Sequence, residues 1–143
     1  MATRGTVIYW DASAVLSVLF RDAHSDAAMD FARRKGRHLV SSLAWAEVHA
    51  VIARMEREKI LADVQASAAR EALTLGPWRF LHVQPSSEFI AELAMRWPLR
   101  GADLWHLALA KTLQAELPEL CLLSFDKRLN TAAEGEQLVL NPG

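Results

Sequence analysis

Cysteine is nearly absent from this sequence: Cys121 is the single one among 143 residues, so an intramolecular disulfide is excluded. Its apolar neighbours Leu120 and Leu122 indicate a buried thiol, and the scarcity of cysteine fits a reducing compartment. Glycine and proline are also few, at six and five residues, while 52% of the residues are hydrophobic. This composition is typical of a globular protein, and the length predicts one domain over residues 1–143.

An excess of basic charge is missing too. Sixteen Lys and Arg stand against 17 Asp and Glu, for a formal net charge of −1, which disfavours a module that binds nucleic acid by charge alone. No apolar run approaches the roughly 20 residues of a membrane span. The start, Met1–Thr6, leads into the apolar stretch Val7–Trp10 without the pattern of a secretory signal. We therefore expect a cytoplasmic protein that does not contact a membrane.

Helical periodicity dominates what is present. Apolar positions three and four residues apart predict helices over Leu43–Met55, Leu61–Leu75, Phe89–Trp97 and Leu104–Leu113, with further helical stretches over Ala12–Phe20 and from Lys127 to about Ala133. Ser41 or Ser42 and Ser86 or Ser87 are expected N-caps, Gly76-Pro77 is expected to end a helix, and Gly101 interrupts the apolar pattern before Asp103.

Short apolar runs between these helices predict strands. They are Val7–Trp10, Leu39–Val40, Phe80–Val83 and Leu120–Ser124, and a fifth strand over Leu138–Leu140 is left open. The segments between them are too long for hairpins, so the connections should be crossovers. The predicted fold class is therefore α/β, a short parallel sheet of four to five strands covered by helices on both faces.

Two acidic residues lie at strand-to-helix junctions. Asp11 follows the strand Val7–Trp10, Asp126 follows the run Leu122–Phe125, and each opens a helical stretch. Such junctions lie at the carboxyl edge of a parallel sheet, where open α/β folds bind their ligands. An Asp at a helix start is also a favoured N-cap, so capping remains an alternative that does not exclude metal binding.

Two further acids complete a set of four. Glu47 has only apolar neighbours three and four positions away on its helix, so it needs a partner from elsewhere or access to solvent. Asp103 lies in the first turn of a helix, with Arg100 and His106 within local reach as an alternative surface pairing. Four carboxylates at one place repel one another unless a cation neutralises them, and an all-oxygen site suits Mg²⁺ or Mn²⁺.

The segments around these acids resemble the four acidic motifs of the PIN domain family. In sequence order they are Tyr9–Leu16, Ser41–Val48, Leu99–Ala108 and Leu122–Leu129. The resemblance spans nearly the whole chain, and the ordered set of four motifs is more specific than any one of them. Among PIN proteins, a small chain with this layout is most similar to the VapC ribonuclease toxins of bacterial and archaeal VapBC toxin–antitoxin pairs.

The resemblance implies a PIN-like three-layer fold and an RNA endonuclease that depends on Mg²⁺ or Mn²⁺, forms a homodimer and is inhibited by a VapB-type antitoxin. It matches Asp11 and Asp103 to the principal metal ligands, with Glu47 and Asp126 completing the acidic pocket. A metal held there activates a water for in-line attack on the phosphodiester.

Several other residues are candidates for supporting roles. On the resemblance, Ser13 and Ser124 match hydroxyl residues that orient the carboxylates. Lys127 and Arg128 adjoin the expected site and are the candidate contacts to RNA phosphates, whereas the basic run Arg33–Arg37 is more typical of a solvated helix end. The tryptophans are expected mainly in packing, with Trp45 and Trp105 as candidates for a dimer or antitoxin surface. The five histidines lack zinc-site spacing.

Two competing functions follow from the same residues. A haloacid-dehalogenase-type phosphatase also begins with an Asp after its first strand, but it requires a second acid where this chain has Ser13. A non-catalytic interaction module, in which the carboxylates only cap helices, is compatible with the near-neutral charge. Metal binding separates the nuclease from this module.

Overall fold

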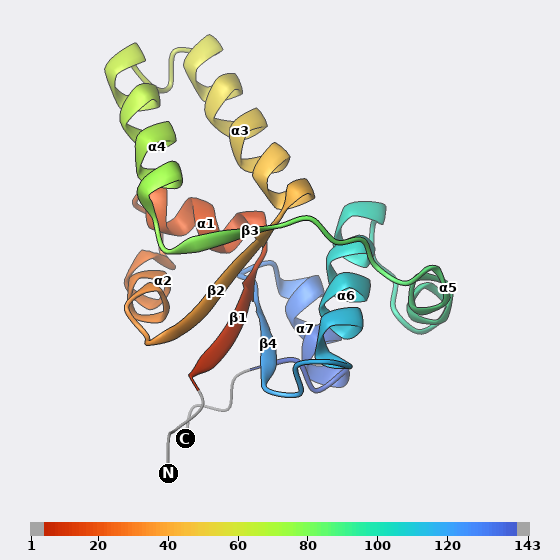
Figure 1. Ribbon diagram of the computed structural model, residues 1–143. Helices are drawn as coiled ribbons and strands as arrows, with labels where there is room; N and C mark the ends of the chain where they lie inside the picture. The colour runs from red at the N-terminus through yellow and green to blue at the C-terminus, as the bar shows by residue number, and fades with distance from the viewer. Residues whose placement is uncertain (1–4, 140–143) are drawn as a thin grey trace.

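A four-stranded parallel sheet forms the centre of the protein, which the computed structural model describes over residues 5–139. The strands are β1 (Thr6–Trp10), β2 (Gly36–Ser41), β3 (Trp78–Leu81) and β4 (Leu120–Leu123), in the spatial order β3-β2-β1-β4 (Figure 1). β1 pairs with β2 on one side and with β4 on the other. The chain therefore changes direction across the sheet at β1, and the carboxyl end of β1 lies at the switch point where such sheets bind ligands.

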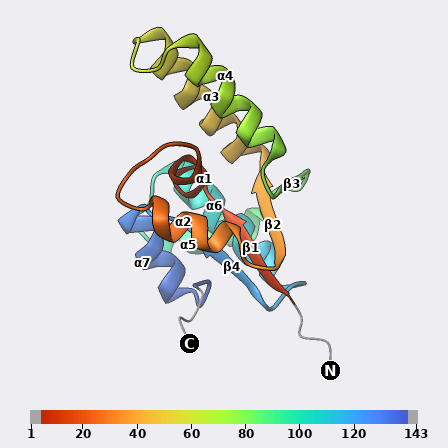
Figure 2. The same ribbon diagram turned by 90° about the vertical axis from the view of Figure 1, so that its left-hand side faces the viewer.

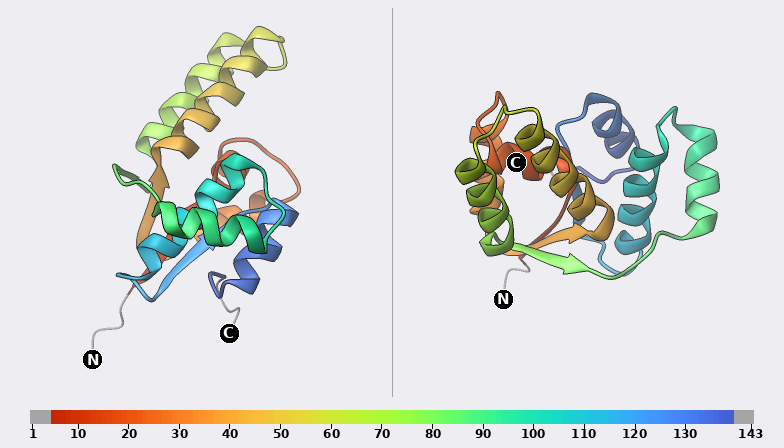
Figure 3. Two further views of the ribbon diagram at one scale, coloured as in Figure 1. Left: turned by 90° about the vertical axis from the view of Figure 1, so that its right-hand side faces the viewer. Right: turned by 90° about the horizontal axis from the view of Figure 1, so that it is seen from above.

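Helices cover both faces of this sheet (Figure 3). They are α1 (Ala12–Leu19), α2 (Ser25–Ala32), α3 (Ser42–Arg57), α4 (Asp63–Leu75), α5 (Ser87–Arg96), α6 (Gly101–Gln114) and α7 (Lys127–Gly135). Successive side chains of a strand point to opposite faces. Ile8 and Trp10 accordingly pack in a core with α1 to α4, while Val7 and Tyr9 pack in a second core with α5, α6 and α7. The predicted three-layer α/β fold is confirmed.

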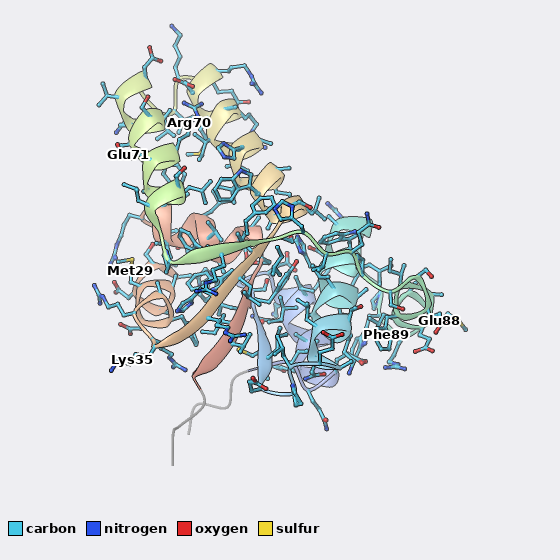
Figure 4. The ribbon with its side chains drawn as sticks, in the orientation of Figure 1. Met29, Lys35, Arg70, Glu71, Glu88 and Phe89 are labelled. Atoms are coloured by element: carbon cyan, nitrogen blue, oxygen red, sulfur yellow. The ribbon has the colours of Figure 1, made fainter. Side chains whose placement is uncertain are left out.

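Helices α3 and α4 form a hairpin that projects beyond the sheet (Figure 2). Ile52 of α3 is buried in the same core cluster as Ala66 and Leu73 of α4. Arg70 lies on the side of α4 that faces α3, whereas Glu71 points away from it (Figure 4). The Arg70 guanidinium meets the Glu56 carboxylate at 2.8 Å, which ties the two helices together.

The predicted helix signals are largely confirmed. Ser41 is the N-cap of α3 and its Oγ accepts from the Ala44 N–H at 3.1 Å, while Ser86 Oγ accepts from the Phe89 N–H at the start of α5. Gly76 is the C-cap of α4. Gly101 is the first residue of α6. The interruption that it makes in the apolar pattern therefore marks a helix start.

Some boundaries differ from the prediction. β2 extends over Gly36–Ser41 although only Leu39–Val40 carried a strand signal, because pairing with β1 holds its exposed first residues, Gly36 and Arg37, in the sheet. β3 begins at Trp78, two residues before the predicted start, and β4 ends before Ser124. Helix α2 was not predicted, since only Ser25 and Ala28 are buried on it and no apolar stripe is visible. Residues 138 and 139 are not in a strand, and Leu140 lies outside the described residues.

Within the described residues 5–139, no helix has the length and apolar character needed to cross a lipid bilayer.

Candidate active site

Asp11 anchors the site at the carboxyl end of β1. It is the N-cap of α1, is only 4% exposed, and accepts hydrogen bonds from the Ala14 N–H at 2.9 Å, Ser13 Oγ at 2.7 Å and Ser124 Oγ at 2.5 Å. Burial raises the pKa of the Asp11 carboxyl, and the three hydrogen bonds oppose that rise. The predicted capping role is present, yet a carboxylate has about four acceptor positions, so one remains for a further ligand.

Two serines join the ends of β1 and β4 around Asp11. Ser13 Oγ donates to Asp11 and accepts from the Phe125 N–H at 3.0 Å. Ser124 Oγ likewise donates to Asp11 and accepts from the Asp126 N–H at 3.0 Å. Each hydroxyl therefore uses its donor on the carboxylate and its acceptor on the loop after β4. These hydrogen bonds connect the Asp11 carboxylate to the backbone of the loop that carries Asp126.

Glu47 has its partner on a distant helix. The Nε2 of His106 in α6 lies 2.7 Å from Glu47 Oε1, and the Nδ1 of the same ring lies 2.6 Å from the hydroxyl of Tyr9 in β1. His106 is 2% exposed and Tyr9 is fully buried. An ionised carboxylate only accepts hydrogen bonds, so Nε2 must be the donor, and in the neutral ring Nδ1 then accepts from Tyr9. Glu47 is thus positioned by a chain of two hydrogen bonds, of which the Tyr9–His106 bond is buried and the His106–Glu47 bond is partly buried.

Asp103 and Asp126 line one small cavity together with two arginines. The cavity has a volume of about 230 Å³ and is lined by Arg100, Asp103, Asp126 and Arg128. Asp126 is the N-cap of α7, where its Oδ1 accepts from the Leu129 N–H at 3.0 Å. Partial burial, followed by the negative charges of Asp126 and Glu47, raises the pKa of Asp103. The acids from α3, α6 and the end of β4 are therefore close enough to repel one another.

The four carboxylates are ligands of the kind that a hard divalent cation prefers, although in the described residues their side chains are not arranged as a metal-binding site. Asp11, Glu47, Asp103 and Asp126 supply only oxygen ligands, which suits Mg²⁺ or Mn²⁺. Burial and, after it, the negative charges of Asp126 and Glu47 raise the pKa of Asp103, and a bound cation would oppose both effects. Among the residues from 5 to 139, however, no three His, Cys, Asp or Glu side chains are already arranged to hold a metal. The acids converge on one sheet edge without the closed geometry of a loaded site.

The expected contacts to RNA lie in different places. Arg128 lines the acidic cavity, and Lys127 and Arg128 together border an adjacent apolar pocket. All residues of the basic run Arg33–Arg37 are exposed. The run leads into the start of β2, where Figure 4 labels Lys35, and so lies at the opposite end of the sheet from the acids. This run is therefore not brought into the site.

The tryptophans proposed for an intermolecular surface pack within the chain. Trp45 contacts the ring of Phe80 edge-on, with 5.5 Å between ring centroids, and Trp105 packs against the core on the α6 side of the sheet. Both are partly buried.

Sequence reasoning missed two functional candidates. Local spacing suggests for His106 a pairing with Asp103 or a structural role, but its Nε2 lies within hydrogen-bond distance of Glu47, 59 residues away in the chain. Arg100 was considered only as part of a surface pair, but it lines the cavity with Asp103 and Asp126. The one available signal for His106 was its place in the apolar run Leu104–Ala108, where a polar side chain needs a buried partner.

The chain belongs to the PIN domain family, whose profile matches residues 8–135. It is similar to Ribonuclease VapC46 of Mycobacterium tuberculosis, with 31% identity over 128 residues, which cover 89% of this chain and 90% of the relative. Membership of the PIN family excludes the alternative of a haloacid-dehalogenase-type phosphatase.

Solved structures share the fold at lower identity. PAE2754 from Pyrobaculum aerophilum has a TM-score of 0.63 at 19% identity, covering 91% of this chain and 81% of its own. M. tuberculosis VapC20, a sarcin–ricin loop cleaving toxin, has a TM-score of 0.58 at 16% identity, covering 87% and 94%. VapBC2 from Rickettsia felis, solved bound to a DNA fragment from its promoter, has a TM-score of 0.51 at 13% identity, covering 82% and 97%.

Proposed function

We propose that this chain is a divalent-metal-dependent RNA endonuclease and the toxin of a type II toxin–antitoxin pair. The observation that supports the proposal is that Asp103 lies close enough to Asp126 and Glu47 for their charges to raise its pKa. Ser124 in turn joins Asp11 to the loop that carries Asp126. Membership of the PIN family and similarity to a ribonuclease support it. Residues 1–143 would form a single catalytic domain acting on RNA in the cytoplasm.

The four carboxylates would hold Mg²⁺ or Mn²⁺, with Asp11 and Asp103 as the principal ligands. When bound, such an ion polarises a phosphoryl oxygen and lowers the pKa of a water molecule. The protein's own contribution is positioning. Ser13 and Ser124 keep Asp11 in one orientation, and the hydrogen bond from His106 does the same for Glu47.

Three cations beside the acids would orient the RNA. Arg100 and Arg128 line the same cavity as Asp103 and Asp126, and Lys127 borders the neighbouring pocket. Guanidinium and ammonium groups bind phosphate oxygens, and each such contact adds affinity that weakens with salt. The mixture of acids and cations in one cavity suits a phosphodiester whose backbone lies across a metal site.

A VapB-type antitoxin and a second copy of the chain are the proposed protein partners. The structural neighbour VapBC2 was solved as a toxin–antitoxin assembly on promoter DNA, which supports a partner of this class. A short reading frame beside this gene, encoding a DNA-binding protein that co-purifies with the chain, is the expected finding. A chain that purifies without such a partner and does not slow growth when expressed alone would contradict the toxin assignment.

The direct test is RNA cleavage. The purified chain is incubated with total cellular RNA in Mn²⁺ or in EDTA, and new 5′ ends are mapped. We expect discrete cuts in Mn²⁺ that disappear in EDTA and in Asp103→Asn. Asp63→Asn is the matched control, because Asp63 is also in the first turn of a helix but lies on the projecting helix α4. Cuts by Asp103→Asn at the wild-type rate would refute the assigned site.

The interaction module remains the second candidate because Asp11 and Asp126 do cap helices. It predicts neither cleavage nor Mn²⁺ binding by the folded chain. Glu47 and Asp103 cap no helix, so the module leaves two of the four acids without a role.

A further inference from the structure

An apolar pocket adjoins the acidic cavity. It has a volume of about 270 Å³ and lies between the α5–α6 connection and the first turns of α7, lined by Trp97, Pro98, Leu99, Lys127, Arg128 and Thr131. The acidic cavity is lined by Arg100, Asp103, Asp126 and Arg128, so Arg128 borders both. The two hollows are therefore neighbours with opposite character, one apolar and one charged.

The indole of Trp97 forms a rigid wall of this pocket. Its Nε1 donates to Glu136 Oε2 at 2.8 Å, and Glu136 is itself buried and held by Arg96 at 2.6 Å and Lys111 at 3.5 Å. The ring lies so close to Gly135 that a Cβ there would be 2.2 Å from Trp97 Cη2. A ring fixed by a hydrogen bond to a buried carboxylate and by close packing does not have to be ordered when a ligand binds.

The charges at the rim indicate what kind of ligand fits. Lys127 and Arg128 are exposed cations bordering an otherwise apolar surface. A ligand with a flat apolar body and an attached anion satisfies both parts, and a nucleotide has this chemistry. Aromatic side chains stack on unpaired bases, and Arg and Lys bind the adjoining phosphate.

We propose that this pocket binds one nucleobase of the RNA, flanking the phosphate that lies in the acidic cavity, with Lys127 and Arg128 on the connecting phosphate. The biological meaning of this inference rests on the proposed nuclease function. The binding itself requires neither the metal nor cleavage, so the two can be tested apart.

The first test is binding in EDTA. The indole N–H signal of Trp97 is assigned in ¹⁵N-labelled protein with Trp97→Phe and followed while each of the four ribonucleoside 5′-monophosphates is added. We expect at least one nucleotide to shift the signal saturably at millimolar concentration, whereas ribose 5-phosphate, which lacks the base, does not. Equal shifts with ribose 5-phosphate, or no shift with any nucleotide, would overturn the proposal.

A filled pocket provides the matched comparison. Thr131 is exposed on α7 and its Oγ1 donates to the Lys127 carbonyl, while Thr74 is exposed on α4 and makes the same bond to Arg70. We expect Thr131→Phe to weaken nucleotide binding at least tenfold and Thr74→Phe to leave it unchanged. Loss of nucleotide binding in both variants would overturn the proposal. It would also be overturned if an antitoxin, but none of the nucleotides, shifted the Trp97 indole signal, because a protein side chain would then occupy the pocket.

The second test uses a cleaved oligonucleotide. Each base around the mapped cut is replaced in turn by an abasic site. We expect one position to lower kcat/KM at least about fivefold in the wild type and in Thr74→Phe, the size of a lost stacking contact, and to cause no further loss in Thr131→Phe. The same abasic penalty in Thr131→Phe would overturn the base pocket while leaving the nuclease assignment intact. Absence of any cleavage by the wild type would refute the nuclease function, not the nucleotide binding measured in EDTA.

Discussion

Asp103, a residue of the proposed metal site, is unfavourable to the fold when it is ionised. Partial burial and the neighbouring charges of Asp126 and Glu47 raise its pKa above the ordinary 3.8. The folded state therefore binds this proton more tightly than the unfolded state does. As a result, stability falls as the pH rises from the ordinary value through the raised one.

Asp103→Asn should stabilise the metal-free protein at neutral pH because it removes a charge that the fold disfavours. We expect thermal unfolding in EDTA at pH 7.5 to show a midpoint about 2 °C higher than wild type. The difference should shrink as the pH falls toward the ordinary value of 3.8 and vanish about one pH unit below it, where the wild-type carboxyl is protonated in both states. A lower midpoint for Asp103→Asn at pH 7.5 would mean that the carboxylate stabilises α6 through the helix dipole instead.

Tyr9 and His106 should be coupled in stability because they share a buried hydrogen bond at 2.6 Å. Tyr9→Phe leaves His106 Nδ1 without that partner, and we expect urea unfolding to show a loss of about 1–3 kcal/mol. In a cycle with His106→Leu, the double variant should lose at least about 0.5 kcal/mol less than the sum of the single losses. Strictly additive losses would show that the bond contributes little.

The residues that could be predicted are those whose local sequence places them. Asp11 and Asp126 follow strands and open helices, so their common edge follows from the rules of parallel sheets. The partner of Glu47 could not be predicted, because His106 lies on another helix and local spacing carries no information about which helices meet. The role of Trp97 was hidden for the same reason, since Glu136 reaches it from the far end of α7.

Elements with a strong one-sided pattern were predictable, and those without it were not. Helices α3 to α6 carry apolar stripes and were predicted within a few residues. Helix α2 buries two small residues, Ser25 and Ala28, so periodicity could not reveal it. The shifted start of β3 has a related cause. The apolar run Phe80–Val83 predicted a buried strand, but Phe80 and Val83 are 39% and 41% exposed.

The end of α7 should be sensitive to a single methyl group. At Gly135 a Cβ would lie 2.2 Å from Trp97 Cη2, so Gly135→Ala must displace the indole or the helix end. We expect a loss of about 1–3 kcal/mol in urea unfolding, with a changed Trp97 indole signal. Gly101→Ala is the control, because no atom of the described residues lies within 4 Å of a Cβ at this helical position, and it should be neutral or stabilising. Equal effects of the two substitutions would contradict the contact.

The whole molecule brings distant segments together through its topology. The order β3-β2-β1-β4 sets β4, at the end of the chain, beside β1, at its start, so Ser124 reaches Asp11 across 113 positions. The parallel, layered class of this fold follows from alternating strands and helices. The strand order does not follow from that pattern, because several orders satisfy the same connections. For this reason the acids were predictable as a set, and their individual contacts were not.

Metal binding should stabilise the entire fold and reverse which of the wild type and Asp103→Asn has the higher melting temperature. A ligand that binds only the folded state adds about 2.7 kcal/mol at one hundred times its Kd, or about 5–10 °C for a chain of this length. We expect Mn²⁺ to raise the wild-type melting temperature in this way and EDTA to reverse it. Asp103→Asn should melt above wild type in EDTA but below it in saturating Mn²⁺, because the carboxylate that destabilises the metal-free fold is the one proposed to bind the ion. Asp63→Asn should follow the wild type under both conditions. If Mn²⁺ stabilised Asp103→Asn as much as the wild type, the ion would bind elsewhere, and if it stabilised neither, the carboxylates would be left with the capping roles of the interaction module.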